Sequence, residues 1–414
     1  MAERDVRDVA IVGCGPVGAV MANLLGQAGL RVAIYEIGDS VYHLPRAAHF
    51  DAEIMRVFQA IGLAEAVLPA TRPIKGMHFV RADGEKLFGF DAPPGVGPQG
   101  WPAGFLFYQP DLERALRDGF ARFPSLDVRY EHEVLGFEQD DDAVAIRVRD
   151  VRSGEERTEH ARYLLGADGG RSVVRKLAGM ELEDLGFDQP WLVVDTMLKR
   201  DVPLPDVALQ FCDPARPATF VPSTGAHRRW ELMLMPGDVP EEMERRERVE
   251  ELLRPWLSAG DADIIRAVVY TFHALVAKQW RDRRVLIVGD AAHQMPPFLG
   301  QGMCSGIRDA HNLAWKLRSV LAGCAPESLL DTYQQERAPH VRAIIERAVG
   351  IGRIIQTTDP AIASARDAHF ASGGAMPGEG EPGMPALAGG ILSATPRAGT
   401  LFPQPSVRTA EGEH

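Results

Sequence analysis

The chain has few cysteines, no long apolar run and no excess of positive charge, and each deficit excludes a class of protein. Its four cysteines are far apart, so neither a disulfide framework nor a zinc or other metal site is predicted (Cys14, Cys212, Cys304 and Cys324). The formal net charge of −12 argues against a general nucleic-acid binder or an anionic-membrane binder. No apolar stretch could span a bilayer, and the charged start MAERDVRD lacks the apolar core of a secretory signal. We therefore expect a reduced, cytoplasmic protein without nucleic-acid or membrane partners.

Length and composition indicate an ordinary globular protein with two joined domains. Charged residues make up 25% and hydrophobic residues 45% of the chain, which is typical of folded globular proteins. One hydrophobic core rarely extends over 414 residues, so the chain is expected to divide.

A glycine-rich motif near the N-terminus predicts a dinucleotide site. A strand over 9–12 runs into GCGPVG at 13–18, which is followed by a helix to about 28 and a strand ending at Glu36. The three glycines allow a tight turn, close approach of a pyrophosphate and close helix–strand packing, and the helix N-terminus faces the phosphates. Glu36 stands where an acidic residue accepts hydrogen bonds from ribose hydroxyls. The motif fits NAD or FAD, whereas the carboxylate disfavours NADP at this site.

A second stretch predicts a ligand beside a carboxylate. The run RVLIVGD indicates a buried strand that ends at Asp290, and Pro296 and Pro297 are then expected to exclude a helix and keep the backbone extended. Two glycines and a helix with one buried face follow over 300–317. A carboxylate, a stiff loop and a helix N-terminus around one cleft would suit a polyol beside a ring that becomes anionic, as in reduced flavin. A strand–loop–helix connection without a ligand is the alternative.

Three further polar residues lie at junctions that could face the same cleft. Arg46 follows the ribose-binding strand, where it could reach a pyrophosphate or a carboxylated substrate, or be a solvated surface charge. Gln109 precedes a helix and could bond a phosphate or ribityl oxygen, or be an ordinary loop residue. Asp168, in GADGG, is either a second carboxylate over the cleft or the N-cap of a short helix.

The remaining segments predict a second sheet and a helical C-terminal region. Alternating runs over 126–165 suggest antiparallel strands, and those over 190–280 suggest a mainly antiparallel sheet laid over the cleft. A long helix is expected over 328–353, and a loop-rich, partly disordered tail after about 356. As a group, the polar and aromatic residues of the second sheet would suit a planar aromatic acid, although each alone is more often core or rim (Gln210, Phe211, His227, Arg229, Trp230, Tyr270 and His273).

With these motifs in place, residues from about 8 to about 355 resemble the class A flavoprotein monooxygenases of the para-hydroxybenzoate hydroxylase fold, and most of all the 3-(3-hydroxyphenyl)propionate hydroxylases. The resemblance rests on GCGPVG…YE, PRA, QPDLERAL, GADGGRSVVRK, CDPARP, VGDAAHQMPPFLGQGMCSGIRDAHNLAWKL and LLDTYQQERAPH. It implies an α/β fold, with a Rossmann-like FAD-binding domain on a parallel sheet, an inserted, mainly antiparallel substrate-binding sheet and a C-terminal helical segment.

The resemblance also implies domain limits. The FAD-binding domain would comprise 1–75, 103–185 and 281–355, and the substrate-binding domain 76–102 and 186–280. Residues 356–414 would be a loop-rich tail, the remnant or the start of the C-terminal domain that family members usually carry.

Family roles are carried over to matching positions. The predicted FAD-binding residues are Gly13, Gly15, Pro16, Val17, Gly18, Glu36, Ile37, Arg46, Gln109, Val134, Asp168, Asp290, Pro297, Gly300, Gly302 and Met303. The predicted substrate pocket consists of Gln210, His227, Arg229, Trp230, His273, Pro297 and Phe298. The predicted catalytic groups are the Pro297 carbonyl, which would contact the substrate phenol, with His49 and Arg46. Relatives acting on simple phenols carry an aspartate base where this chain has Ala48, so His49, a water or another group remains open as the base.

The implied activity is hydroxylation of a phenolic ring with NAD(P)H and O₂ through a flavin C4a-hydroperoxide. The expected substrate is a phenolic acid of the 3-(3-hydroxyphenyl)propionate type, with Arg46 and Arg229 as candidates for holding its carboxylate. NADH or NADPH would bind transiently, and a homodimer is open. One alternative is a hydroxylase of polycyclic aromatic polyketides or antibiotics, and another is a non-catalytic FAD-binding redox protein. A flavin halogenase is disfavoured because no WxWxIP-like segment is present.

Overall fold

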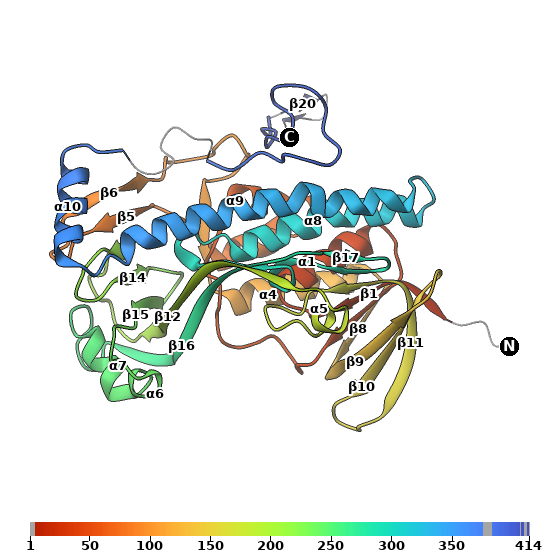
Figure 1. The fold of residues 1–414 in the computed structure, drawn as a ribbon, viewed down its shortest axis with the longest axis horizontal. Helices are drawn as coiled ribbons and strands as arrows, with labels where there is room; N and C mark the ends of the chain where they lie inside the picture. The colour runs from red at the N-terminus through yellow and green to blue at the C-terminus, as the bar shows by residue number, and fades with distance from the viewer. Residues whose placement is uncertain (1–4, 376–382, 406, 410–411, 414) are drawn as a thin grey trace.

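The computed structural model describes residues 5–375, 383–405, 407–409 and 412–413. Within these ranges, a pair of long helices covers two large sheets (Figure 1). One sheet has parallel strands at its centre and the other is mainly antiparallel. The predicted fold class is thereby confirmed: a Rossmann-like parallel sheet, an antiparallel second sheet and C-terminal helices. The predicted domain limits remain a prediction.

The first sheet is the nucleotide-binding half of the molecule. Its strands pair in parallel in the order β18–β11–β1–β2–β8. They are β18 (Val285–Ile287), β11 (Glu156–Gly166), β1 (Val6–Val12), β2 (Val32–Glu36) and β8 (Leu126–Tyr130). The central strands are continuously apolar because both faces are covered, and Val9, Ala10 and Ile11 are fully buried.

The prediction of antiparallel strands over 126–165 is only partly right. β9 (His132–Gln139) and β10 (Val144–Asp150) pair antiparallel, and β10 also pairs antiparallel with β11. β8, however, runs parallel to β2, because a long crossover through α2 and α4 returns the chain to the same end of the sheet. Minor strand β17 (Arg281–Asp282) closes the opposite edge.

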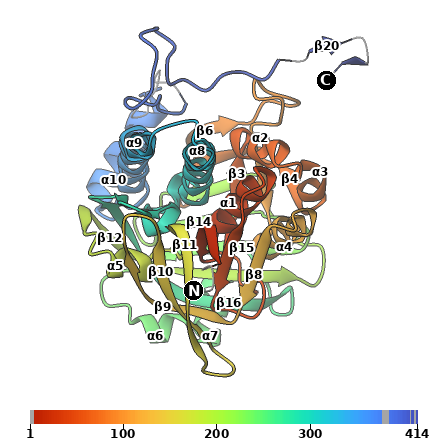
Figure 2. The same ribbon diagram turned by 90° about the vertical axis from the view of Figure 1, so that its right-hand side faces the viewer.

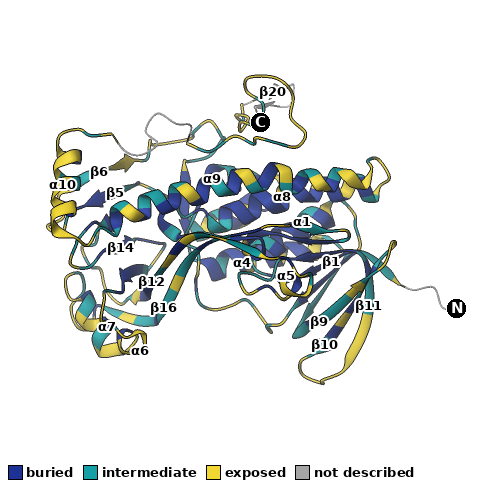
Figure 3. Cartoon of the chain, in the orientation of Figure 1, coloured by how far each residue is buried: buried dark blue, intermediate teal, exposed yellow. Residues whose placement is uncertain are grey.

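Helices α1 (Pro16–Gln27), α4 (Gln109–Asp118) and α8 (Gly302–Leu321) cover one face of the first sheet, and α9 (Asp331–Ile355) lies along α8 (Figures 1 and 2). Helix α8 approaches the glycine-rich loop closely, since a Cβ added to Gly306 would lie 2.6 Å from Val17. Helices α8 and α9 are buried on their inner sides and exposed on their outer sides (Figure 3).

The second sheet has the order β19–β16–β12–β15–β14–β13–β5–β6. Its two long strands, β12 (Leu182–Leu198) and β16 (Ala262–Ala277), extend from the first sheet into the second half of the molecule (Figure 1). The others are β19 (His293–Gln294), β15 (His227–Met233), β14 (Ala218–Val221), β13 (Ala208–Phe211), β5 (Gly76–Val80) and β6 (Lys86–Asp91). Helices α6 (Pro240–Met243) and α7 (Arg246–Leu253) cover the outer face.

Short elements connect the two halves. A three-stranded sheet in the order β3–β7–β4 and helix α2 join the loop after β2 to helix α4. The connecting elements are β3 (His49–Asp51), α2 (Ala52–Ala60), α3 (Ala64–Val67), η1 (Leu68–Ala70), β4 (Thr71–Pro73), β7 (Gly104–Phe107), η2 (Gly119–Arg122), α5 (Val173–Leu177), η3 (Gly289–Ala291), η4 (Pro297–Leu299) and η5 (Glu327–Leu330).

The tail predicted to be loop-rich after about 356 contains helix α10 (Pro360–Ala371), which the sequence analysis did not place. Its N-terminus is locally encoded, because the Asp359 side chain accepts hydrogen bonds from the backbone of Ala361 and Ile362 and proline occupies the first turn. Phe370 then packs at 4.2 Å from Phe88 of β6, a contact invisible in the sequence.

Residues 376–382, which belong to the tail predicted to be partly disordered, lie outside the described residues. Beyond it, the tail runs over the outer side of α9 (Figure 2), and Ile391 N donates to Glu336. A two-stranded ladder of β20 (Arg408–Thr409) and β21 (Gly412–Glu413) follows. Within the described ranges, no helix combines the length and apolar character needed to cross a membrane.

Candidate active site

The glycine-rich loop leaves an open, uncapped helix end at the carboxyl edge of the first sheet. Gly13 has φ +95°, and a Cβ there would lie 2.5 Å from the Ala167 carbonyl oxygen, so only glycine fits. Gly15 precedes α1, no side chain caps the helix, and no described atom lies within 4 Å of an added Cβ. The unpaired N–H groups at the start of α1 therefore face open space, which fits a pyrophosphate.

Glu36 and Ile37 end β2 beside this loop. The Glu36 carboxylate accepts hydrogen bonds from Cys14 N at 2.8 Å and Gly38 N at 2.9 Å, one on each oxygen. Each oxygen keeps a lone pair for a ribose hydroxyl. Ile37 is 61% exposed, so an apolar surface is available next to that ribose position.

Arg117 on α4 supplies a cation under the loop that sequence reasoning missed. Its Nε donates to the Cys14 carbonyl at 3.1 Å, and Nη2 lies 3.4 Å from Glu113. Its Nη1 is buried and has no partner among the described residues. The i, i+4 spacing of Gln109, Glu113 and Arg117 in a helix with an otherwise apolar buried face was the available signal.

Gln109 shapes the loop that carries Arg46. Its Oε1 accepts from Arg46 N at 2.7 Å and Ala47 N at 2.6 Å, and its Nε2 donates to Glu113 at 2.7 Å. The side chain is therefore engaged by protein on both ends, and one amide hydrogen remains for a ligand. Arg46 is exposed, with its guanidinium over the Tyr42 ring at 4.9 Å. Val134, predicted to contact FAD, is a buried core residue of β9.

Asp290 follows β18 with its carboxylate turned away from protein donors. The side chain is open to solvent, and no described residue donates a hydrogen bond to it. Surrounding protein atoms nevertheless remove part of its hydration, which raises the pKa of the carboxyl against the opposing effects of His293 and Arg46. A carboxylate with unfilled acceptor sites fits the hydroxyl groups of a flavin polyol.

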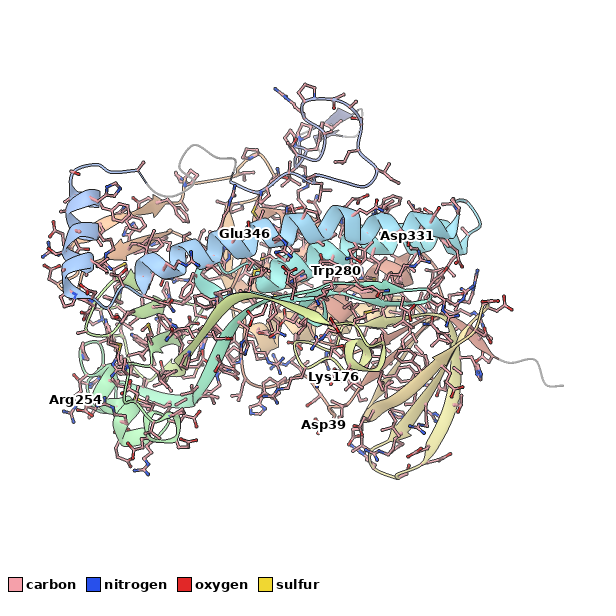
Figure 4. The ribbon with its side chains drawn as sticks, in the orientation of Figure 1. Asp39, Lys176, Arg254, Trp280, Asp331 and Glu346 are labelled. Atoms are coloured by element: carbon pink, nitrogen blue, oxygen red, sulfur yellow. The ribbon has the colours of Figure 1, made fainter. Side chains whose placement is uncertain are left out.

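A buried network fixes the turn that presents Asp290. Asp309 of α8 accepts from Gly289 N at 3.2 Å and lies 2.6 Å from His293 Nε2, while Arg337 of α9 lies 2.8 Å from its other oxygen. Trp280 lies beneath α9 (Figure 4) and contacts the His293 ring at 5.4 Å. The turn is therefore anchored to both long helices.

The same network makes stability depend on pH. His340 Nδ1 accepts from Arg337 Nη1 at 3.1 Å, and burial, together with Arg337 and Arg308, lowers the pKa of His340 to about 3. In the unfolded chain this ring titrates at about 6.5. Since the folded pKa is depressed, the stabilisation is present above pH 6.5 and is lost as the pH falls towards 3.

We therefore expect the free energy of unfolding in urea to decrease by about 2 kcal/mol between pH 7 and pH 5 through His340 alone. The His340→Gln variant should show a pH slope smaller by this amount, whatever its stability at pH 7. Equal slopes for the variant and the wild type would contradict this role.

The alternative considered for Asp168, the N-cap of a short helix, falls instead to Ser172, whose Oγ accepts from Arg175 N at 2.9 Å at the start of α5. Asp168 supports the same helix start, because its Oδ1 accepts from Ser172 Oγ at 2.5 Å and its Oδ2 accepts from Val173 N at 2.7 Å and Val174 N at 3.1 Å. Its Cα nevertheless lies against the glycine-rich loop, 2.9 Å from a Cβ added to Gly13. A direct role with FAD stays a prediction.

The proline loop joins the turn that carries Asp290 to helix α8. The expectation that both prolines exclude a helix was wrong for Pro297, which begins η4, because proline is tolerated in the first turn. The Pro297 carbonyl accepts from Gly300 N at 2.8 Å and keeps one lone pair. Gly300 has φ +62°, and α8 begins at Gly302, followed by Met303, without a capping side chain.

His49 is wedged behind this loop. A Cβ added to Gly104 would lie 2.7 Å from its Nε2, and one added to Gly300 would lie 3.0 Å from its Nδ1. Burial lowers the pKa of His49, against the opposing effects of Asp51 and the Gly300 backbone, so the ring is neutral near pH 7. Its function as the phenol base stays a prediction.

The inner face of the second sheet carries a buried charge cluster. Asp195 of β12 lies 2.7 Å from His227 Nε2, 2.8 Å from Arg229 Nε and 2.6 Å from Arg266 Nη2. Although burial alone would raise the pKa of Asp195, Arg229, the His227 hydrogen bond and Arg266 hold it well below its usual range. Asp195 is therefore a permanent anion between two cations.

Arg229 is mostly committed to protein. Its Nη1 donates to the Arg46 carbonyl at 2.5 Å and its Nη2 to the Pro45 carbonyl at 2.8 Å, besides the bonds to Asp195. One N–H remains. Through the other bonds, Arg229 fixes the Arg46 loop to the second sheet. Only this one N–H would be available for the predicted contact with a substrate carboxylate.

The other predicted pocket residues divide between locations. Gln210 faces inwards and accepts from Thr219 Oγ1 at 2.6 Å. Trp230 was predicted to line the substrate pocket. Its side chain instead lies on the opposite face of β15, because side chains alternate along a strand, and its ring packs against Trp256 in the outer core. His273 of β16 contacts Asp188 of β12 and makes no described contact with the Asp195 charge cluster. Phe298 is buried and packs on Trp191 at 5.6 Å.

Comparison with known proteins identifies the family. Residues 7–348 match the family described as FAD binding domain. The chain is 45% identical over 415 residues to a probable NADH-specific resorcinol 4-hydroxylase of Rhodococcus jostii (strain RHA1), covering 99% of this chain and 76% of that protein. It is 40% identical over 348 residues to the 3-(3-hydroxy-phenyl)propionate/3-hydroxycinnamic acid hydroxylase of Shigella sonnei (strain Ss046), covering 84% of this chain but only 62% of that protein.

Among solved structures, the flavin-dependent monooxygenase PieE in complex with FAD and substrate superimposes with a TM-score of 0.77 at 27% identity, covering 85% of this chain and 65% of that chain. These matches confirm the predicted FAD cofactor, the resemblance to 3-(3-hydroxyphenyl)propionate hydroxylases and the predicted class of aromatic monooxygenase. The chain therefore belongs to the FAD-binding domain family, and the relatives compared above are named as hydroxylases of phenolic compounds.

Proposed function

We propose that the protein adds one oxygen atom from O₂ to a phenol that bears a second polar group meta to the hydroxyl, with NADH as the electron donor. The observation that carries the proposal is a set of polar groups with free hydrogen-bonding positions at one edge of the first sheet. The uncapped start of α1, the Glu36 carboxylate and the Asp290 carboxylate follow the carboxyl ends of the parallel strands β1, β2 and β18. The substrate class and the preference for NADH follow the names of the two relatives.

Each residue would have a distinct task. The α1 N-terminus and Arg117 would hold the pyrophosphate, Glu36 a ribose, and Asp290 the polyol of FAD. Bound FAD would carry two electrons from NADH to O₂, which gives one oxygen atom to the phenol and releases the other as water. The Pro297 carbonyl would accept the phenol O–H, which raises electron density on the ring and favours its attack on an electrophilic oxygen.

The inner sheet face and the proline loop would also exclude water. Trp191 of β12 contacts Phe298 at 5.6 Å and Phe272 at 6.4 Å, forming an apolar wall on the sheet side of Pro297. A dry pocket is needed because water promotes loss of activated oxygen as H₂O₂. Arg46, exposed beside the cleft, is the remaining candidate for contacting a substrate carboxylate or the pyrophosphate.

We further propose a cytoplasmic location and leave a homodimer as a proposal to be tested by sedimentation. The cytoplasm supplies NADH, and Cys14, Cys212, Cys304 and Cys324 are all free thiols, which suits a reducing compartment.

The function can be tested with FAD-loaded protein, NADH and a panel of phenols. We expect resorcinol or 3-(3-hydroxyphenyl)propionate to stimulate NADH oxidation, with a product heavier by one oxygen atom, and slower oxidation of NADPH. A fused polycyclic phenol serves as the comparison. NADH oxidation that no phenol accelerates, or that yields only H₂O₂ with every phenol, would refute hydroxylation.

A further inference from the structure

Glu231 of β15 is a buried carboxylate that lacks a hydrogen-bond donor among the described residues. It is 8% exposed, and no side chain or backbone N–H in the described ranges donates a hydrogen bond to it. The nearest cationic atom, Arg229 Nη1, lies 4.0 Å from Oε1. Burial raises the pKa of Glu231, with Arg229 and Arg266 opposing and Asp195 adding to the rise. A largely desolvated carboxylate without a protein donor is unfavourable, and the Glu231 side chain keeps 10% exposure, so a donor from outside the chain can reach and stabilise it.

The alternation of β15 turns Glu231 inwards. Trp230 faces the outer core, so its neighbours Arg229 and Glu231 face the first sheet. Arg229 confirms this direction, because it reaches the carbonyl groups of Pro45 and Arg46. One end of this face therefore lies at the Arg46 loop.

The other end of the same face lies at the proline loop. Two positions beyond Glu231, Met233 pairs with Trp191, and Trp191 contacts Phe298. Glu231 therefore stands between the Arg46 loop and the Pro297–Phe298 loop, two segments that carry predicted FAD-binding residues. Its flanking residues on the neighbouring strands are Val193 and Thr219.

A purely structural role explains this position poorly. Arg229 and Arg266 already share Asp195 at 2.8 and 2.6 Å, and neither guanidinium is within hydrogen-bond distance of Glu231. Without Glu231, the cluster would carry a net charge of +1, from the Arg229 and Arg266 guanidinium groups and the Asp195 carboxylate. With an ionised Glu231 it is neutral, so the pocket side offers an acceptor and no spare cation.

We propose that Glu231 determines substrate specificity by accepting a hydrogen bond from a second hydroxyl group of the substrate, while the Pro297 carbonyl accepts the first. This inference rests on the proposed hydroxylation. It selects a benzene-1,3-diol over a phenol with a carboxylate side chain, because a second negative charge beside Glu231 is repelled whereas a hydroxyl donor is bound.

The test compares two ligands on FAD-loaded variants without NADH. Calorimetry gives the Kd of resorcinol and of 3-(3-hydroxyphenyl)propionate, and FAD content and melting temperature are recorded alongside. For Glu231→Gln, we expect the Kd of resorcinol to rise about tenfold and that of the acid to fall about tenfold, since the charge is removed and the cluster becomes cationic. Glu241→Gln, the same change at an exposed position of α6, should leave both values unchanged.

Unchanged Kd values for both ligands in Glu231→Gln would overturn the inference while leaving hydroxylation by the wild type intact. Absence of any hydroxylated product from the wild type would instead refute the proposed function. If Glu231→Gln loses FAD or unfolds, Glu231→Asp decides, because it keeps the charge and shortens the reach. It should still reject the acid and bind resorcinol more weakly, and wild-type affinity for resorcinol would overturn the inference.

Discussion

An Asp290→Ala variant is expected to lose most of its FAD during purification, with a Kd for FAD raised by about 10- to 100-fold. The carboxylate is exposed and receives no hydrogen bond from the described residues. Its acceptor sites would therefore be filled by hydroxyls of the flavin polyol. Hydrogen bonds to a charged group contribute about 1.5–3 kcal/mol, and 1.4 kcal/mol corresponds to a factor of ten in Kd.

The flavin-to-protein absorbance ratio and titration of the stripped protein with FAD measure this effect without reference to activity. Asp201→Ala is the matched control, since Asp201 is exposed on the connection after β12. Asp290→Asn separates charge from shape, because it keeps one acceptor oxygen and should fall between the wild type and the alanine variant. Full flavin occupancy in Asp290→Ala would remove Asp290 from the cofactor site.

Replacing Asp195 with alanine is expected to lower the free energy of unfolding by about 3–5 kcal/mol, because two buried guanidinium groups would lose their shared counterion. Asp195 is fully buried, and Arg229 and Arg266 have no other described carboxylate within hydrogen-bond distance. Arg229 would also lose its orientation towards Pro45 and Arg46. FAD binding should therefore weaken together with stability.

Urea unfolding of the FAD-free protein measures the loss, and Asp263→Ala provides the control. Asp263 lies on the same sheet and pairs with Lys199 at 2.6 Å, but its side chain is 56% exposed. An exposed ion pair is worth about 0–1 kcal/mol, so the two aspartates should differ severalfold. A loss below about 1 kcal/mol for Asp195→Ala would show that the cluster contributes specificity without stability.

The nucleotide half of the site was predictable because its signals are local. Gly13, Gly15 and Glu36 act through backbone turns and a strand end, and the structure places them at one edge of the first sheet. Asp290 was likewise predictable from the strand that precedes it. Arg117 was missed although its i, i+4 spacing from Glu113 was visible, because a charged helix face is usually solvated.

The substrate half was less predictable because strand alternation needs a reference face. The run HRRWELM contains two arginines, a tryptophan and a glutamate, and a shift by one residue exchanges those that face the pocket. Trp230 was assigned to the pocket and lies in the outer core, whereas Glu231, which was not singled out, lies inside. Only the packing of α7 against one face decides between these two arrangements.

The sequence by itself determined a dinucleotide site at the first strands, since glycine turns and apolar periodicity act over a few neighbouring positions, and the resemblance of its motifs to known hydroxylases added FAD, the fold and the family. Tertiary structure alone decided which polar groups remain without partners. Arg229 and Gln109 were candidates for binding ligands until distant carbonyl and amide groups engaged them, whereas Asp290 and Glu231 kept their acceptor sites unfilled by the described residues. The physical reason is that a hydrogen bond is satisfied by whichever donor the fold brings within about 3 Å, and the sequence separation of those partners here exceeds 60 residues.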